Sequence, residues 1–408
     1  MKPSVVNYVI YHSPCNDGDT GAMIAKRFFK EKSIENVIFH ATSIGKPLPN
    51  DIEGKNILLI DFAYPKDILQ KLISLAKEVL ILDHHKTNME DLNEIPSYQK
   101  VFNMELSGAT LAWNYFYPEK PVPLLVKMIE DRDLWKKNIK GSDDLSNYLY
   151  AHPSDFDLLE SLLDENNLEG AISKGIAFRE LNNFYVDNFA KWATIRFMQI
   201  KDQFYLVAHS DCGIASITSD LGACLLKNYP IVDFAAVYYI NNYTDGTSFS
   251  LRSTDKNTDV SQIAKHFNGG GHRNASGLKV SYTTNHLPGI MIDNNNLVKI
   301  ITNIYFDKIK DYNVVYLMSN THKEELSKYL LQDRASTIQT CMAIGNKDER
   351  CALAIIWDYN PSTNKSYYTI TIDTNLSNED KQKIRLLFGK DLIASAFEQD
   401  GCQNTFFI

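Results

Sequence analysis

Long apolar runs are missing from this 408-residue sequence. No stretch approaches the ~18 apolar residues in a row that a membrane-spanning helix needs. The N-terminal text MKPSVVNYVIYHSPCNDG passes from a short apolar stretch into polar residues, without the cleavage site of a secretory signal. We therefore expect a cytoplasmic protein that has no membrane partner.

Cysteine is scarce, and a basic excess is absent. The six cysteines form no C-x-x-C pair and are too few for a disulfide framework in a chain of this length, so we expect reduced thiols. The 42 basic and 50 acidic residues give a net charge of −8, which argues against a surface that coats long duplexes. A small site filled by divalent cations stays compatible with this charge, because bound cations make an acidic site locally positive.

The first part of the chain alternates short apolar runs with amphipathic helical patterns. The runs VVNYVIYH, ENVIFHAT, NILLIDFAY and EVLILDHH predict strands, whereas GAMIAKRFFKE and KDILQKLISLAKE predict helices. Strands separated by helices predict an α/β fold with a parallel, Rossmann-like sheet covered on both faces. Such sheets bind ligands at the carboxyl ends of their strands.

Four segments follow from the changes of pattern along the chain. We expect the parallel-sheet domain at 1–150, a helical connector at 151–200, a smaller mixed α/β domain at 201–284 and an α+β extension at 285–408. A helical pattern of apolar residues runs from about Asp155 to Ile200. The dipeptide Asp245-Gly246 predicts a tight turn. In the extension, LVKIITNIYFDKI and SNEDKQKIRLLFG predict helices, the second capped by Ser377.

The densest chemical signal is the triplet Asp83-His84-His85 at the end of a buried-looking strand. A carboxylate beside imidazoles suits Mn²⁺ or Fe²⁺ better than Mg²⁺ alone, because imidazole favours transition metals. Further candidate ligands fall at other strand or helix ends, where a sheet of this kind would bring them together. They are His12, Asp17 and Asp19 around a glycine turn, Asp61 after the next strong strand, and Asp131 and Asp133 in IEDRDLW.

Taken in order, these residues resemble the DHH–DHHA1 superfamily of phosphoesterases over about residues 5–284. Within it they are most similar to the oligoribonuclease (nanoRNase) and short-oligonucleotide branch. The resemblance rests on the ordered residues His12, Asp17-Gly18, Asp61, Asp83-His84-His85, Asp131 and Gly269-Gly270-Gly271-His272.

The resemblance implies a two-metal centre. By position, one ion falls to His12 and Asp17, and the other to His84 and Asp131, with Asp61 as the bridge between them. It further implies two Mn²⁺ per chain, with Mg²⁺ or Co²⁺ as possible substitutes. The same match assigns His85 and Asp83 to catalysis, as residues that lie close to the metal ligands and support them.

The sequence allows more than one role for several of these positions. The first Asp of the family's D-x-D pair falls on Cys15, which is either a thiolate ligand or a small buried apolar residue. Asp19 lies beyond the glycine rather than before it. Asp131 and Asp133 both qualify as the last ligand, and the spacing to Trp135 favours Asp131, which leaves Asp133 as a supporting or helix-capping residue.

A second group of residues predicts a clamp for the substrate. Consecutive glycines let backbone N–H groups approach a phosphate, and the loop of Gly270, Gly271 and His272 resembles the substrate-binding loop of DHHA1 domains. Arg252 resembles the family's phosphate-binding arginine, whose planar fork holds a phosphate in bidentate fashion.

These residues predict a Mn²⁺-dependent phosphodiesterase that hydrolyses short single-stranded RNA or DNA to mononucleotides, or 3′,5′-bisphosphate nucleotides. A RecJ-like single-strand exonuclease and a cyclic-dinucleotide phosphodiesterase are the alternatives within the superfamily. An alternative of another class is a nucleotide-binding or sensing module whose hydrolase site is weakened at Cys15. A homodimer is compatible with the sequence but is not indicated by any motif.

Overall fold

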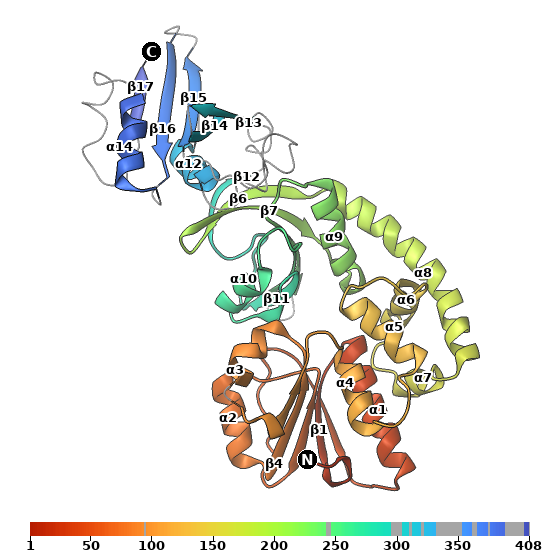
Figure 1. Ribbon diagram of the computed structural model, residues 1–408. Coiled ribbons are helices and arrows are strands. Elements are labelled where there is room, and N and C mark those ends of the chain that lie inside the picture. Colours follow the sequence, from red (N-terminus) through yellow and green to blue (C-terminus); the bar gives the residue numbers. More distant parts are fainter. Residues whose placement is uncertain are drawn as a thin grey trace. The chain divides into compact units, whose positions relative to one another are not determined.

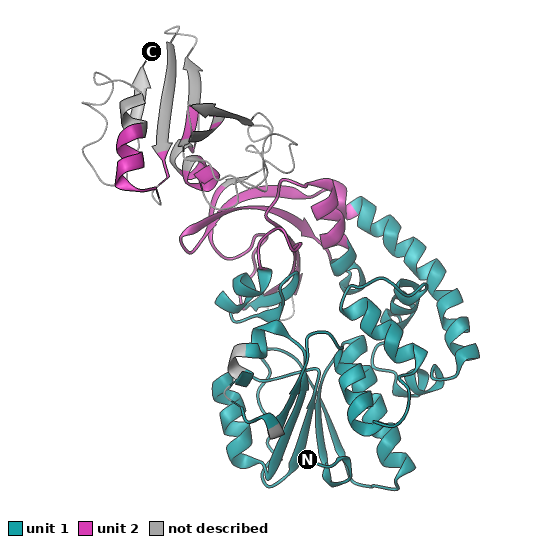
Figure 2. Cartoon of the chain, viewed as in Figure 1, with its two compact units in different colours: residues 1–188, 214–220, 260–280 teal, residues 189–213, 221–259, 281–408 magenta. Residues whose placement is uncertain are grey.

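The structure, a computed structural model, describes residues 1–93, 95–241, 246–294, 304–309, 312–319, 322–331, 353–360, 365–373, 376–387 and 404–407. Two compact units make up the chain (Figures 1 and 2). The first comprises residues 1–188, 214–220 and 260–280, and the second comprises 189–213, 221–259 and 281–408. The four segments expected from the sequence remain a prediction.

A five-stranded parallel sheet forms the centre of the first unit. Its strands are β1 (Tyr8–His12), β2 (Ile38–Thr42), β3 (Asn56–Ile60), β4 (Glu78–Asp83) and β5 (Lys100–Phe102). They lie in the order β2-β1-β3-β4-β5, and all neighbours pair in parallel. The order reverses between β1 and β3, and such a switch point is where open α/β sheets bind ligands.

Helices cover both faces of this sheet, as Figure 1 shows for α1 and α4 on one side and α2 and α3 on the other. Alternate residues of β3 point to opposite faces: Leu58 and Ile60 join the core under α1 and α4, and Ile57 and Leu59 join the core under α2. The expected α/β class is therefore confirmed. The bounds are α1 (Asn16–Glu31), α2 (Lys66–Leu75), α3 (Met89–Asn93) and α4 (Gly108–Phe116).

The rest of the first unit is mostly helical. It contains a hairpin of β10 and β11 in which Gly270 pairs with Gly277. The elements are α5 (Leu124–Asp133), α6 (Ser142–Tyr150), α7 (Phe156–Ser161), the long α8 (Glu165–Lys191), which continues into the second unit, the beginning of α9 (Thr218–Asn228), α10 (Val260–His266), β10 (Gly270–His272) and β11 (Ala275–Val280). Short 3₁₀ turns are η1 (Pro3–Val5), η2 (Lys86–Asn88), η3 (Ser97–Gln99) and η4 (Ala215–Ile217).

The second unit contains the paired strands β6 (Thr194–Ile200), β7 (Gln203–Asp211), β8 (Phe234–Asn241), β9 (Gly246–Arg252) and β12 (Ile290–Asn294). The expectation of helix up to Ile200 is wrong for the last seven residues, which form β6. TIRFMQI pairs along its whole length with the antiparallel strand β7, and this pairing overrides the helical pattern of its sequence. Asp245 of the expected turn lies outside the described residues.

A further sheet of the second unit has the order β13-β14-β15-β16-β17. Its elements are β13 (Ile304–Ile309), β14 (Tyr312–Met318), α12 (Lys323–Leu331), β15 (Leu353–Asn360), β16 (Lys365–Ile372), α14 (Asn378–Leu387) and β17 (Asn404–Phe407). The helix expected over 297–309 is wrong for Ile304–Ile309, because this segment pairs with β14, and 297–303 lie outside the described residues. Ser377 caps α14 as expected, since its Oγ accepts a hydrogen bond from the Asp380 amide at 3.0 Å.

No helix within the described part of the chain combines the length and the apolar character that crossing a membrane requires.

Two glycines of α8 predict opposite effects on stability. A Cβ on Gly175 would overlap the carbonyl oxygen of Asp144 in α6, whereas a Cβ on Gly170 would meet no atom within 4 Å. Gly175→Ala should lower the free energy of unfolding by about 1–3 kcal/mol through overpacking. Gly170→Ala should raise it by about 0.4–1 kcal/mol, because alanine restricts the unfolded chain. Urea denaturation of both variants would measure this, and equal effects would refute the close packing of α6 and α8.

Candidate metal centre

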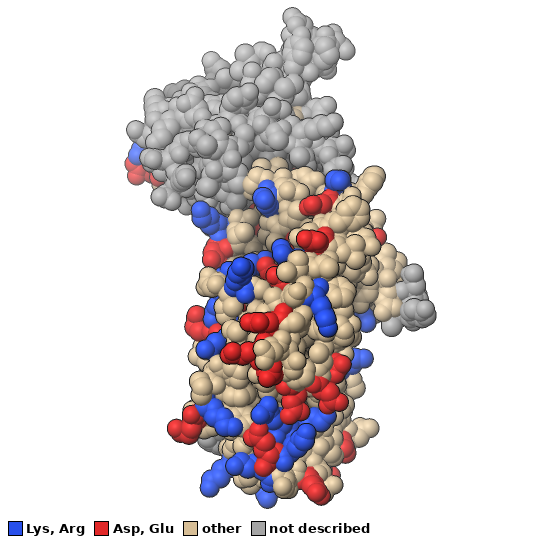
Figure 3. Space-filling view, turned by 90° about the vertical axis from the view of Figure 1, so that its right-hand side faces the viewer, with Lys and Arg blue, Asp and Glu red and all other residues tan. Residues whose placement is uncertain are grey.

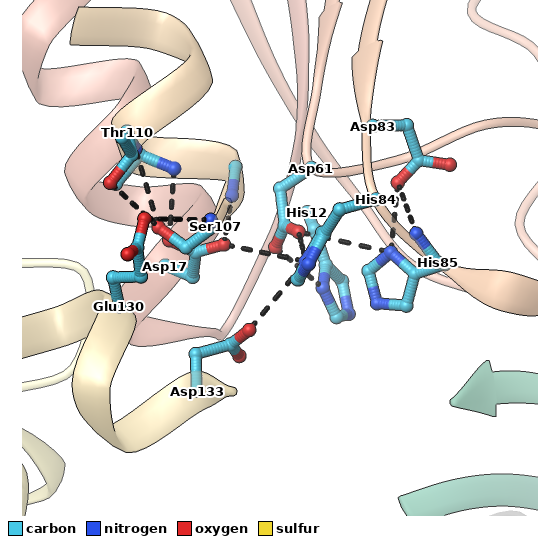
Figure 4. Close-up of polar contacts among 12 residues, drawn as sticks. His12, Asp17, Asp61, Asp83, His84, His85, Ser107, Thr110, Glu130 and Asp133 are labelled. Atoms are coloured by element: carbon cyan, nitrogen blue, oxygen red, sulfur yellow. Dashed lines mark hydrogen bonds and ion pairs between the residues drawn. The ribbon is translucent and has the colours of Figure 1, made fainter. Parts of the chain in front are cut away.

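Asp61 lies at the switch point of the sheet, immediately after β3. Its Oδ2 is 3.2 Å from Nδ1 of His12 at the end of β1, and its Oδ1 is 3.0 Å from Nε2 of His84 after β4 (Figure 4). The carboxylate is buried, and its residue adopts a left-handed backbone conformation with φ of 57°. Each oxygen of one carboxylate thus faces a different imidazole.

Asp17 is held from the opposite side by the N-terminus of α4. Its two oxygens accept hydrogen bonds from the backbone amides of Gly108 and Ala109, the second at 2.9 Å. The free N–H groups and the dipole of a helix N-terminus favour a carboxylate there. A Cβ on Gly108 would overlap Asp61, so this close approach of α4 requires glycine. Ser107 fixes the start of the helix by accepting from the Thr110 amide at 3.3 Å.

Asp133, the last residue of α5, points toward this group of side chains (Figure 4). Its Oδ2 lies 3.6 Å from Nε2 of His84. Asp131 faces another way: it accepts hydrogen bonds from Ser142 Oγ at 2.6 Å and from the Asn138 amide at 2.7 Å. Two positions along a helix turn the side chain by ~200°, so only one of the pair can face the centre. The geometry therefore favours Asp133 over Asp131 as the ligand, and the choice between them stays a prediction.

The side chains of Asp83, His84 and His85, at the end of β4, point in different directions. His84 is fully buried and faces the carboxylates, with Oδ2 of Asp17 at 3.6 Å from its Nε2. Asp83 instead holds His85, whose Nδ1 lies 2.8 Å from Oδ1 of Asp83. Asn88 donates to the other Asp83 oxygen at 2.7 Å, which fixes that carboxylate from both sides. His85 is thereby oriented with 21% of its side chain exposed.

The glycine-rich hairpin of the first unit lies against the same motif. The ring of His272 is 4.8 Å from the rings of both His84 and His85, and it stacks on the second. The amide of Gly271 donates to Oγ1 of Thr87 at 3.0 Å, and a Cβ on Gly270 would press on the same oxygen. This loop therefore needs its glycines for backbone packing.

Three other expected site residues have different places. Cys15 lies at the N-cap of α1 and belongs to a group with His12 and Asp61. Asp19 accepts a hydrogen bond from Ser154 at 3.0 Å and is in none of the ligand groups among the described residues. Arg252 ends β9 in the second unit, where the lack of a side chain on Gly222 leaves room for its aliphatic part.

The pKa values show how strongly charge is concentrated here. Burial opposes ionisation of Asp61, but hydrogen bonds with His12 and His84 outweigh it and hold the pKa of Asp61 well below its usual value. Burial, followed by the nearby Asp61 and Asp133, raises the pKa of Asp17 well above its usual value. Burial lowers the pKa of His84, but the hydrogen bond with Asp61 and the surrounding carboxylates prevail and raise it to about 10.

The donor set fits divalent cations. Ligand atoms of His12, Cys15 and Asp61 lie within 4.8 Å of one another, and so do those of Asp17, His84 and Asp133. Nδ1 of His84 is buried and has no hydrogen-bond partner among the described residues. Carboxylate oxygens and imidazole nitrogens together suit Mn²⁺, Fe²⁺ or Zn²⁺. These two groups of ligands are adjacent, because Asp61 of the first group also faces His84 of the second. Together they could hold two ions.

Several supporting residues were not anticipated from the sequence. Ser107 and Gly108 position Asp17, and Asn88 and Thr87 fix the loop after β4. A signal for the first pair exists, because Ser-Gly-Ala-Thr before an apolar run predicts a helix N-cap. Asn88 carries no comparable signal, since its role depends on the turn of η2.

No protein-family model matches the chain. A curated relative is the uncharacterized protein R106 of Acanthamoeba polyphaga mimivirus, which is 33% identical over 308 residues that cover 73% of each chain. The chain belongs to the R106 family. Membership of this family indicates common ancestry with R106.

Solved structures similar to this R106-family chain have low identity. A pGpG-specific phosphodiesterase, PggH, from Vibrio cholerae is 13% identical, with coverage of 67% of this chain and 93% of that chain, and a TM-score of 0.36. An exopolyphosphatase-related protein from Bacteroides fragilis is 13% identical, with coverage of 68% and 87% and a TM-score of 0.37.

Matched amide substitutions distinguish Asp133 from Asp131. Asp133→Asn should lower metal affinity by more than the about 10–100-fold that outer partners of metal sites typically contribute. Asp131→Asn should leave metal content unchanged but lower the free energy of unfolding by about 1.5–3 kcal/mol, because it weakens buried hydrogen bonds to a charged group. Isothermal titration with Mn²⁺ and thermal unfolding would measure both. The reverse pattern would return the ligand role to Asp131.

Proposed function

We propose that this protein is a two-metal phosphodiesterase that hydrolyses short single-stranded oligonucleotides to mononucleotides. The observation that carries the proposal is Asp61, whose two oxygens face His12 at 3.2 Å and His84 at 3.0 Å. A carboxylate shared between two imidazoles suits the bridge of a two-metal site, such as those of many phosphatases and nucleases. The ordered motif that resembles the DHH–DHHA1 superfamily supports the same chemistry.

One ion would be held by His12 and Asp61, and the other by Asp17, His84 and Asp133. Asp61 would link the two, since its oxygens face both His12 and His84. When bound, two divalent cations supply a nucleophilic water near neutral pH and stabilise charge on a phosphoryl oxygen. We infer Mn²⁺ as the ion that supports turnover best, with Mg²⁺ or Co²⁺ as substitutes, because imidazoles lie among the oxygen ligands.

The pair of Asp83 and His85 would handle the proton. Asp83 orients the ring through Nδ1 at 2.8 Å, which leaves Nε2 of a partly exposed imidazole for the substrate. A carboxylate that fixes the tautomer and direction of a histidine is a common device of general acid–base catalysis. His85 would then donate a proton from its Nε2 to the leaving oxygen of the substrate.

A short substrate agrees with the charge of the chain. The net charge is −8, and the face drawn in Figure 3 shows acidic and basic side chains interspersed, without a basic track. Proteins that bind long single strands usually hold the nucleic-acid backbone in a positively charged groove. A few nucleotides, or a 3′,5′-bisphosphate nucleotide, need only a metal centre and a phosphate clamp, for which Arg252, Gly270, Gly271 and His272 are the proposed residues.

Product analysis tests this function. Labelled RNA and DNA of a few nucleotides, a long single strand, the bisphosphate nucleotide and a cyclic dinucleotide would each be incubated with the full chain and Mn²⁺ or Mg²⁺. Mononucleotides from the short strands are expected. Preferential cleavage of the long strand would indicate a single-strand exonuclease, and of the cyclic compound a cyclic-dinucleotide phosphodiesterase. Nucleotide binding with no turnover and no bound metal would indicate a sensing module.

Asp61→Asn should abolish turnover while the fold persists. Asparagine keeps the shape of the side chain and tolerates the left-handed backbone conformation that Asp61 adopts, so strain does not confuse the result. The rate should fall by more than the about 10–100-fold that even outer partners of metal sites contribute. Asp51→Asn, on the surface of the same unit, is the matched control and should keep full activity. Comparable rates in the two variants would refute the bridge.

Arg252→Ala should weaken substrate binding without changing metal content. Loss of hydrogen bonds to a charged phosphate, worth about 1.5–3 kcal/mol, would raise KM for oligonucleotides about 10–100-fold. Bis-p-nitrophenyl phosphate has no second phosphate to hold and should be affected much less. Arg27→Ala in α1, whose guanidinium pairs with Glu31 at 2.8 Å, is the control. Equal losses for both substrates would mean that Arg252 acts at the reacting phosphate or supports the fold.

A further inference from the structure

The two groups of ligands that meet at Asp61 differ in chemistry. The group of His12, Cys15 and Asp61 contains one nitrogen, one sulfur and one oxygen donor. The group of Asp17, His84 and Asp133 contains one nitrogen and two oxygen donors. Thiolate ligands favour Zn²⁺ and other ions that bind sulfur well, whereas carboxylates suit Mn²⁺ and harder ions. Two such groups would not select the same cation.

The position of Cys15 places its sulfur toward the centre rather than in a core. It is the N-cap of α1 and follows Pro14 in the turn that leaves β1. It is partly exposed, whereas Cys212 is fully buried in the second unit. Within the described part of the chain, Cys15 is the cysteine found in a group of potential metal ligands. Its sulfur lies within 4.8 Å of ligand atoms of an imidazole and a carboxylate, those of His12 and Asp61.

We propose that Cys15 ligates the metal ion held by His12 and Asp61, so that the centre is built for two different ions. The sulfur-containing half takes Zn²⁺, Co²⁺ or Fe²⁺, and the half with Asp17, His84 and Asp133 takes Mn²⁺. On binding, the Sγ–H bond of Cys15 breaks, the proton passes to solvent, and the sulfur donates its electron pair to the cation. This inference rests on the proposed metal centre but does not depend on its substrate.

Cobalt spectroscopy of the full chain tests the sulfur bond without measuring activity. Metal-free protein titrated with Co²⁺ should show visible d–d bands together with a near-ultraviolet thiolate-to-cobalt charge-transfer band. In Cys15→Ser the charge-transfer band should disappear while d–d bands from the second half persist. In Cys224→Ser, which changes another partly exposed thiol, both should remain. Cobalt bound to the wild type without the charge-transfer band would overturn the proposal and leave the proposed function standing.

Two further measurements cover the case in which Cys15→Ser fails to fold. Bound Zn²⁺ should protect Cys15 of the wild type from alkylation at least ~10-fold while Cys224 reacts as before, as mass spectrometry of the peptides would show. Cys15→Asp should lower the ratio of Zn²⁺ to Mn²⁺ affinity about 10-fold or more, since a ligand contributes at least as much as outer partners do. Equal alkylation with and without Zn²⁺ would overturn the inference. Failure of any ion to bind would overturn the metal centre as well.

Discussion

The candidate metal centre of the first unit is arranged around the carboxylate of Asp61. Its carboxylate is buried at the switch point of the sheet, and both of its oxygens face imidazoles. An uncompensated buried charge costs about 3–5 kcal/mol, so the surrounding elements must supply positive charge or cations. β1 supplies His12, the loop after β4 supplies His84, and Gly108 at the start of α4 leaves the space that Asp61 occupies.

Strong periodicity explains which parts of the fold could be predicted. In the parallel sheet, β1, β3 and β4 contain apolar runs that are followed by polar residues, and NILLI of β3 is buried along its whole length. The segments 194–200 and 304–309 were misread, because their apolar residues satisfy a helical and a strand pattern alike. In each case the strand that follows directly along the chain, β7 or β14, folds back as an antiparallel hairpin partner, and this pairing decides between the two patterns.

The candidate site was predictable as a set of residues but not as a geometry. The strand ends carrying His12, Asp61 and His84 meet because parallel strands share one carboxyl edge. Asp131 and Asp133 lie on one helix, and the choice between them depends on which side of α5 faces the sheet. Two interpretations of Cys15 were possible from the sequence, a metal ligand or a buried apolar residue. The proximity of Cys15 to His12 and Asp61 favours the ligand. The substrate-binding roles of Arg252 in the second unit and of Gly270, Gly271 and His272 in the first unit stay predictions.

The hydrogen bonds from Gly108 and Ala109 to Asp17 have a consequence for dynamics. Because the start of α4 holds this carboxylate in place, Asp17 needs little reorganisation when a cation arrives. A cation bound to Asp17 would draw electron density away from both of these hydrogen bonds. The amides of Gly108 and Ala109, and with them the first turn of α4, would therefore register whether the proposed centre is loaded.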